Sequence, residues 1–401
     1  MQHEVRGHTE DRPAGPARRR LLAALPALGV VSGIAGAVGC APAASSTATA
    51  ALPPQLQGAE PPVAAELVAL DTVHGRPPGR AELAALAAAV RAADPAGGGL
   101  ALGAAAFGPA GADADTRGSG TGGSGGTGGS GGTGGSGGTG GSGGTGGGSG
   151  TAVRPRRLRD MPAFPGDLLD PARTHGQVLV QLGGRDPAQA RERAARALTE
   201  LPGWRPRWRA AGHRPDSRVA DGRGLARNPF HFTEGFGNPD GERATADRTL
   251  VRPGDGEPDW AVGGSYQVVR VVQIAAELWD RDSIPEQERV IGRRRDGRWL
   301  DGTPATERPD FAADPAGRLT PLDSHVRRAA PDRRNPPPLV RRSYSHPEGL
   351  LFSCFQRDPG TGFEAVQHRL AGEAMATYLL TVGGGYFFVP PPGDTWLRAF
   401  A

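Results

Sequence analysis

The tract at residues 118–150 constrains the fold of this chain more than any other feature. It holds 33 consecutive Gly, Ser and Thr residues, 22 of them glycine, in a six-residue GGSGGT repeat. A sequence of this kind buries no apolar surface and behaves as a flexible coil. The whole chain has 64 glycines in 401 residues, and outside the tract 42 remain in 368. The tract is therefore a surface insertion, and the rest of the chain is long enough for one large or two medium domains.

The N-terminus has the pattern of an export signal. A basic run, Arg18–Arg20, precedes a mildly apolar stretch, Leu21–Val38, and small residues follow. Paired arginines before a weakly hydrophobic stretch are typical of the twin-arginine route. We predict a twin-arginine-type signal peptide over residues 1–43, a flexible tether over 44–60, and the twin-arginine export machinery as a partner.

Charge and cysteine content narrow the class further. The chain carries 46 basic residues, all arginine, against 42 acidic ones, a formal net charge of +4. Without the signal peptide the excess is 41 minus 39, or +2, which supports no nucleic-acid partner. Two cysteines, Cys40 and Cys354, make no disulfide framework. Cleavage after Ala43, lipid attachment at Cys40 and an uncleaved membrane anchor stay open, so we expect a secreted, periplasmic or envelope-associated protein.

Hydrophobic periodicity predicts the same order of elements twice. In the first half, strands are expected at 63–70, 177–182 and 204–213, helices at 81–93 and 187–201, and a short apolar run at 100–107. In the second half, strands are expected at 267–274, 350–356 and 386–389, and helices at 285–291 and 364–380. Two successive ferredoxin-like α+β units fit this order.

Several ordered motifs then carry a family resemblance. They are PAFPGDLLD at 162–170, RNPFHFTEG at 227–235 with NPD at 238–240, DSHVR at 323–327, LVRRSY at 339–344 and GGGYFF at 383–388. Together they resemble the dye-decolorising peroxidase (DyP-type haem peroxidase) family, in the exported branch that includes the periplasmic deferrochelatase/peroxidase proteins. The resemblance covers roughly residues 60–401 apart from the tract.

The resemblance implies a fold and a function. It implies the tandem ferredoxin-like fold of the dimeric α+β barrel superfamily, with an N-terminal unit at 61–230 that carries the insertion and a C-terminal haem-binding unit at 231–401. It implies haem b, hydrogen peroxide and a phenolic or dye-like electron donor oxidised in one-electron steps. Two alternatives stay open, an envelope deferrochelatase-like protein of iron acquisition with weak peroxidase activity and a non-catalytic haem-binding module. Assembly into a homo-oligomer also stays open.

The resemblance assigns roles to His325 and Arg341, and the chemistry that such a site needs adds Glu373 and Arg270 as candidates. His325 fills the axial-ligand position of the DSHVR motif, and histidine is the usual axial base of haem peroxidases. Glu373 is the candidate acceptor for the other N–H of that histidine, and the alternative is a solvated carboxylate on a helix. Arg341 fills the position of the cation that stabilises charge as the peroxide bond breaks, and it also contacts the haem. Arg270 is a candidate partner for the haem propionates.

The acid position of the motif departs from the family. Glu234 stands where the family has Asp, and His231 stands where the motif begins with Gly. We predict that Glu234 is the catalytic acid-base, although its extra methylene adds reach and one more rotor. Asp240 is the fallback for this role. His231 is either a second group above the haem or a bystander that points away.

Overall fold

The computed structural model describes residues 54–56, 61–108, 153–199, 201–214, 227–233, 236–304, 307, 310–332 and 335–400. These residues all belong to one compact unit, Thr49–Ala401. The predicted signal peptide, most of the tether, the glycine-rich tract and Glu234 lie outside the described residues. Within those residues, no helix combines the length and apolar character that a membrane crossing requires.

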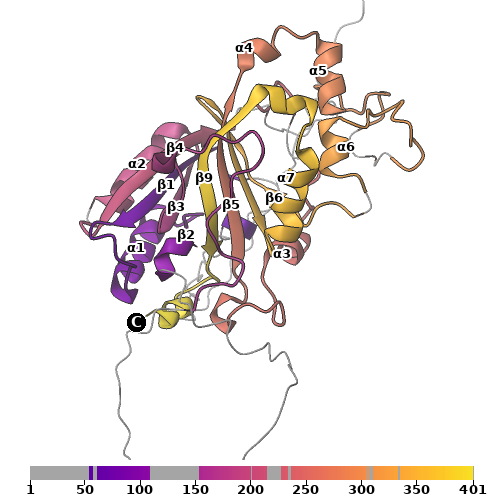
Figure 1. The fold of residues 1–401 in the computed structure, drawn as a ribbon. Helices are drawn as coiled ribbons and strands as arrows, with labels where there is room; N and C mark the ends of the chain where they lie inside the picture. The colour runs from indigo at the N-terminus through magenta and orange to yellow at the C-terminus, as the bar shows by residue number, and fades with distance from the viewer. Residues whose placement is uncertain are drawn as a thin grey trace, which may run out of the picture. The chain divides into compact units, whose positions relative to one another are not determined.

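The first half of the sequence forms a βαββαβ unit (Figure 1). Its four strands are antiparallel and lie in the order β2-β3-β1-β4, which is the order of a ferredoxin-like sheet. The elements are β1 Ala64–Thr72, α1 Arg80–Ala93, β2 Gly99–Gly103, β3 Val178–Gly184, α2 Pro187–Leu198 and β4 Trp204–His213. The strand predicted at 204–213 is confirmed with the same bounds.

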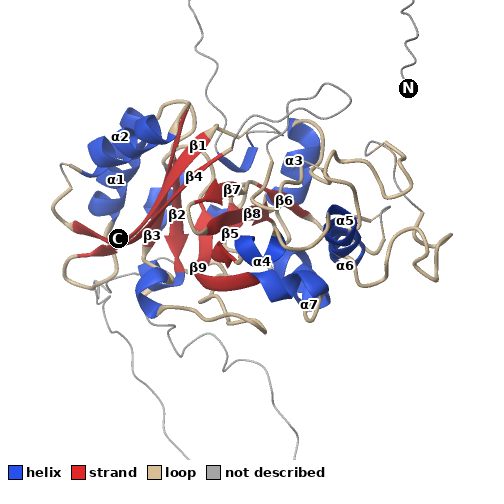
Figure 2. Cartoon of the chain, turned by 90° about the horizontal axis from the view of Figure 1, so that it is seen from above, coloured by secondary structure: helices blue, strands red, loops and turns tan. Residues whose placement is uncertain are grey.

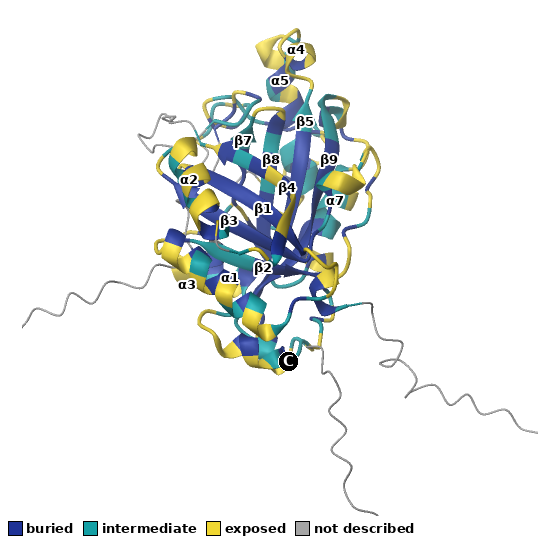
Figure 3. Cartoon of the chain, turned by 90° about the vertical axis from the view of Figure 1, so that its left-hand side faces the viewer, coloured by how far each residue is buried: buried dark blue, intermediate teal, exposed yellow. Residues whose placement is uncertain are grey.

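The two helices of this unit pack on one face of its sheet (Figure 2). Leu83, Leu86 and Val90 of α1 share a core with Val68 and Leu70 of β1. Every residue of β1 is buried because the opposite face of the sheet is covered as well. Figure 3 shows the buried strands β1 and β3 beside the partly exposed helices α1 and α2.

The second half forms a similar unit with extra short elements. Its strand order is β9-β5-β8, with β6 and β7 paired to the far edge of β8. The strands are β5 Ser265–Ile274, β6 Leu339–Arg341, β7 Tyr344–His346, β8 Gly349–Gln356 and β9 Leu379–Val389. The helices are α3 Glu242–Thr249, α4 Ala276–Trp279, α5 Ile284–Ile291, α6 His325–Ala329 and α7 Ala365–Leu370.

Two narrow seams join the units into one nine-stranded sheet. At the first seam, Leu102 of β2 pairs with Phe388 of β9, and at the second His213 of β4 pairs with Ser345 of β7. Because β5 also pairs with β8, the strand pairings close on themselves around an apolar core. The α+β fold class with tandem ferredoxin-like units is confirmed. The domain boundary at residue 230 stays a prediction.

One predicted element is wrong. Residues 364–380 do not form a single helix, since α7 ends at Leu370 and β9 already begins at Leu379. Gly372, with a φ of 72°, takes the left-handed conformation that commonly ends helices. Glu373 then precedes a 3₁₀ turn, Ala374–Tyr378.

Candidate active site

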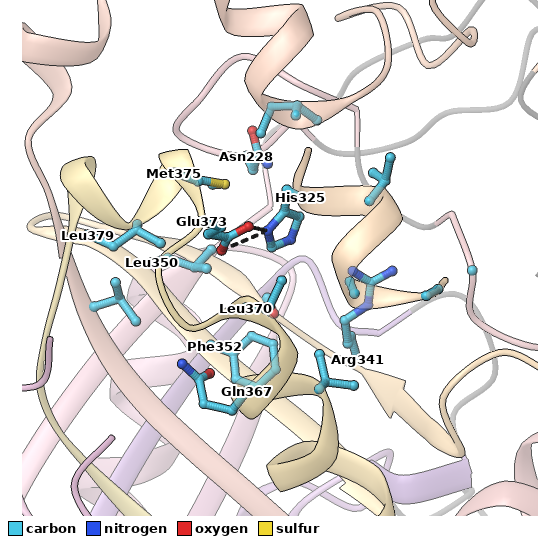
Figure 4. Close-up of a pocket in the computed structure, with 18 of the residues that line it drawn as sticks. Asn228, His325, Arg341, Leu350, Phe352, Gln367, Leu370, Glu373, Met375 and Leu379 are labelled. Atoms are coloured by element: carbon cyan, nitrogen blue, oxygen red, sulfur yellow. Dashed lines mark hydrogen bonds and ion pairs between the residues drawn. The ribbon is translucent and has the colours of Figure 1, made fainter. Parts of the chain in front are cut away.

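A cavity of about 350 Å³ lies on the outer face of the C-terminal sheet. Its floor comes from alternate residues of neighbouring strands, Arg270 of β5, Phe352 of β8 and Thr381 of β9. Residues of α6 and α7 line it as well (Figure 4). Its size is within the range of small-molecule sites, and leucine, phenylalanine and methionine side chains make up much of its wall.

His325 and Glu373 form a hydrogen-bonded pair in this cavity (Figure 4). Nδ1 of His325 lies 2.8 Å from Oε2 and 3.1 Å from Oε1 of Glu373. The carboxylate is buried, with 4% of its side chain exposed, while the imidazole is 26% exposed. Because Nδ1 is engaged, Nε2 is the ring nitrogen left to coordinate a metal.

The helix that carries His325 is about one turn long, and hydrogen bonds to the preceding segment, residues 314–321, hold it in place. Ser324 precedes it and donates its Oγ hydrogen to the Pro321 carbonyl over 2.7 Å. On its buried side Arg327 donates to Asp314 Oδ2 at 3.1 Å and to the Thr320 carbonyl at 2.7 Å. Such a short helix has little stability of its own, so these contacts hold the imidazole in place.

Arg341 ends β6 and lines the same cavity. Its Nη2 donates to the Phe236 carbonyl, and its backbone N–H donates to Asn238 Oδ1 over 2.9 Å. The Asn238 amide donates in return to the Arg341 carbonyl, also over 2.9 Å. The end of β6 is thereby fastened to the segment that follows Glu234, which itself lies outside the described residues.

Arg270 lies at another part of the cavity and is paired with Asp167. Its Nη2 donates to Asp167 Oδ1 and to Thr381 Oγ1, the latter over 2.6 Å. The guanidinium also lies against the rings of Phe164 and Phe363, 5.3 and 5.6 Å from their centroids. Burial lowers the pKa of Arg270, and the Asp167 carboxylate opposes that change. Within the described residues Nη1 has no hydrogen-bond partner.

Asp167 lies within the PAFPGDLLD motif, but the sequence alone assigned no role to it. The signal was the PAFPGD string itself, which sets this carboxylate after a tight turn at Gly166. Asn228 lies within the RNPFHFTEG motif, and the sequence alone assigned no role to it either. Its Oδ1 accepts from the backbone N–H groups of Phe230 and Phe232, two residues of the cavity wall, at 3.1 and 3.0 Å.

His231 and Asp240 lie away from the cavity. His231 has a φ of 69°, and its Nε2 is 3.1 Å from Asp280 Oδ1 on the surface. The imidazole is 51% exposed and is not among the described residues that line the cavity. Asp240 is exposed and does not line it either. Of the two interpretations of His231, the structure therefore matches the bystander.

The described residues do not provide a set of ligands for a bare metal ion. They hold no group of three or more His, Cys, Asp or Glu side chains arranged to bind one. His325 is a single donor at the edge of an apolar cavity, which suits a metal that brings its other ligands with it, as in a metal macrocycle. The fold and the cavity thus define an α+β barrel protein with a one-histidine cofactor site.

Comparison with known proteins finds similarity to one family. The family model for the C-terminal part of Dyp-type peroxidases matches residues 225–394. The deferrochelatase of Escherichia coli (strain K12) is 36% identical over 258 residues, which cover 59% of this chain and 60% of that protein. The chain thus spans about 60% of the length of the curated relatives that it matches. Residues 225–394 of this chain are thus similar to the C-terminal part of Dyp-type peroxidases.

Solved structures of DyP-type peroxidases are similar to this chain as well. The oxyferrous complex of DtpA from Streptomyces lividans matches with a TM-score of 0.65 and 26% identity, over 85% of this chain and 93% of DtpA. The DyP-type peroxidase from Cellulomonas bogoriensis matches with a TM-score of 0.62 and 25% identity, over 84% of this chain and 93% of that one.

Proposed function

We propose that this protein is a haem peroxidase that reduces hydrogen peroxide and oxidises phenolic or dye-like donors in one-electron steps. The observation that carries the proposal is the His325–Glu373 pair at the wall of an apolar cavity. An imidazole whose Nδ1–H is held by a buried carboxylate would be a strong donor to haem iron. Leu350, Phe352 and Leu379 offer the apolar surface that a porphyrin plane needs. Haem b, when bound, supplies the iron that exchanges electrons with peroxide and donor.

The chain's own residues handle protons and charge. Glu373 accepts the Nδ1 hydrogen of His325, orients the ring and raises its basicity. Arg341 supplies a fixed positive charge at the cavity, where negative charge develops on the peroxide oxygens. Glu234 takes a proton from one peroxide oxygen and delivers it to the other. This last role rests on the motif alone.

Arg270 takes a haem propionate in this proposal. Its Nη1 is the donor left over after Asp167 and Thr381 have engaged Nη2. Asp167 already offsets the charge of the guanidinium. The contribution of Arg270 to propionate binding is therefore mainly one directed hydrogen bond, and little net charge.

The experiment begins with the chain from residue 44 onward, loaded with haem. We expect a Soret band, its perturbation by peroxide within milliseconds, and turnover of a reducing dye. Glu234→Gln should slow the reaction with peroxide about a hundredfold or more in stopped-flow absorbance. Asp240→Asn is the matched control and should react like the parent protein. Unchanged kinetics in Glu234→Gln would remove the acid-base role from that residue, and absence of a Soret band would refute the whole proposal.

A second candidate function is favoured by the names of the curated relatives, which are deferrochelatases. In this alternative the protein serves iron acquisition, by binding haem or releasing its iron, and its peroxidase activity is weak. Haem-loaded protein would then yield iron-free porphyrin, visible by its fluorescence, under reducing conditions. Dye turnover without porphyrin release favours the first function, and release with little turnover favours the second.

We also propose export by the twin-arginine route, supported by the arginine run before the weakly apolar stretch. Replacing Arg18 and Arg19 by Lys should leave the protein in the cytoplasm, as measured by cell fractionation. Normal export of this double variant would contradict the route.

A further inference from the structure

Arg342 is a buried cation that has no carboxylate partner among the described residues. It follows β6 directly, and only 2% of it is exposed. Its Nη1 donates to the Arg341 carbonyl over 3.2 Å, while Nε and Nη2 have no hydrogen-bond partner among the described residues. The titratable groups that influence it are the phenol of Tyr344 and another cation, Arg214. Burial and the charge of Arg214 lower the pKa of Arg342 to about 10, although Tyr344 opposes the change, so the guanidinium is still charged at neutral pH.

This arrangement costs stability. A buried charge without a partner loses its hydration and gains no ion pair in return, and each unmet donor adds to the cost. The local backbone does not require arginine, because the hydrogen bond from the Arg342 N–H to the Ser353 carbonyl, 2.7 Å long, is open to any residue except proline. An apolar side chain of similar length would therefore give a more stable protein.

The position of the charge suggests what offsets this cost. The Arg341 carbonyl that accepts from Arg342 belongs to a residue of the cavity wall. The same carbonyl accepts from Asn238, a second residue of that wall, over 2.9 Å. The guanidinium of Arg342 thus contacts the backbone of a residue that lines the cavity, without lining the cavity itself. Because little water lies between buried groups, the charge of Arg342 is only weakly screened from a ligand in the cavity.

We propose that Arg342 is a positioning residue whose uncompensated charge holds the anionic groups of the ligand, foremost its carboxylates, in the cavity. This inference rests on the proposed function, since it takes a porphyrin with carboxylates as the ligand. It separates Arg342 from Arg270, whose charge is offset by Asp167.

The test uses two porphyrins that differ only in their carboxyl groups. Protoporphyrin IX and its dimethyl ester are titrated into the cofactor-free protein from residue 44 onward, and quenching of tryptophan fluorescence gives both dissociation constants. Arg342→Met should weaken binding of the free acid about tenfold, from Coulomb's law at the effective dielectric of protein sites. The ester should bind as it does to the parent protein.

Three further measurements separate the field of Arg342 from a structural role. Arg342→Lys keeps the charge and should keep the preference for the free acid. Arg80→Met removes an exposed arginine from α1 and should change neither affinity. Arg342→Met should melt at a higher temperature than the parent, whereas a structural arginine would give a lower one.

The outcomes divide clearly. An unchanged ratio of the two affinities in Arg342→Met overturns the inference and leaves the proposed function standing. Equal weakening of acid and ester, or loss of folding in Arg342→Met, also overturns it, because both indicate a structural role. A parent protein that binds neither porphyrin overturns the proposed function itself.

Discussion

Glu373 and Glu66 are both buried carboxylates, but only Glu373 has a hydrogen-bond partner for both of its oxygens. Glu373 has His325 as a hydrogen-bond partner at 2.8 Å. Glu66 lies on β1 with 5% of it exposed, and its Oε2 has no partner among the described residues. The first carboxylate serves the site, whereas the second lowers the stability of the sheet that supports it.

Removing the charge of Glu373 should weaken the cofactor site. Glu373→Gln keeps the size of the side chain and removes the negative charge that makes the imidazole a strong donor. We expect haem affinity to fall about tenfold and the reduction potential of the iron to rise, measured by titration and by redox titration. Glu277→Gln, an exposed change on α4, should alter neither. A haem affinity and potential equal to those of the parent would show that the carboxylate does not tune the histidine.

Glu66 should make stability depend on pH. Burial raises the pKa of Glu66, although Arg209, Arg191 and His346 oppose the change. The folded state therefore holds a proton on this group more tightly than the unfolded state, so stability falls as the pH rises from about 4.5 through the raised pKa.

Glu66→Gln should remove this dependence. The variant should be about 1 kcal/mol more stable than the parent at pH 7 and equally stable at pH 4, measured by urea unfolding. Glu82→Gln is the control, since Glu82 is paired with Arg76 at 2.8 Å and its loss brings no gain at pH 7. A gain for Glu66→Gln that persists at pH 4 would argue against titration as the cause.

Two short helices frame the site and depend on each other. α6 has 5 residues and α7 has 6, both too short to persist alone. Arg369 of α7 donates to the Arg328 and Ala329 carbonyls at the end of α6, at 3.1 and 2.9 Å. Arg328 in turn donates to the Ala371 carbonyl at 2.9 Å. The ends of the two helices are thereby fastened together beside Glu373.

Gly372 decides where α7 ends and where Glu373 lies. Its φ of 72° is strained for any residue with a Cβ, although no atom lies within 4 Å of one placed there. Gly372→Ala should cost about 1 kcal/mol of stability and displace Glu373, which would change the NMR signals of the His325 ring. Gly393→Ala meets the same strain in open space, at a φ of 85°. It should cost as much stability and leave the His325 signals unchanged, and equal effects on those signals would contradict the placement argument.

At the scale of the whole molecule, the first half of the sequence helps to build the cavity of the second half. The segment 153–170 lies between β2 and β3 in sequence, yet its side chains pair with the C-terminal half. Arg157 pairs with Glu257 at 2.6 Å, Arg159 with Glu364 at 2.7 Å, and Asp167 with Arg270 at the cavity. The two units therefore share the site as well as the sheet.

Deletion of residues 118–150 should leave this arrangement intact. The tract has only Gly, Ser and Thr residues, which bury no apolar surface. Shortening that connection from 44 to 11 residues reduces its closure entropy, and we expect stability to rise by about 1 kcal/mol with haem affinity and dye turnover unchanged. A chain with the tract shuffled in order is the control. Loss of haem binding on deletion would reveal a role for the tract.

The sequence by itself determined the elements that local burial patterns define. Strand β4 follows from alternating apolar residues and helix α1 from apolar residues at helical spacing, because both periods arise from neighbours along the chain. A motif also singled out His325, and the need of such a histidine for an acceptor suggested Glu373, although no local pattern relates two residues 48 positions apart.

Only the tertiary structure decided which distant groups meet. It placed Glu373 against His325, Asp167 against Arg270 and Arg342 behind the cavity wall, and it turned His231 toward the surface. It also ended α7 at Leu370, where strand pairing with β5 outweighs a continuous amphipathic pattern. The physical reason is the same in each case. Local periodicity reports which side of an element is buried, whereas the partner that buries it is set by the packing of elements far apart in the chain.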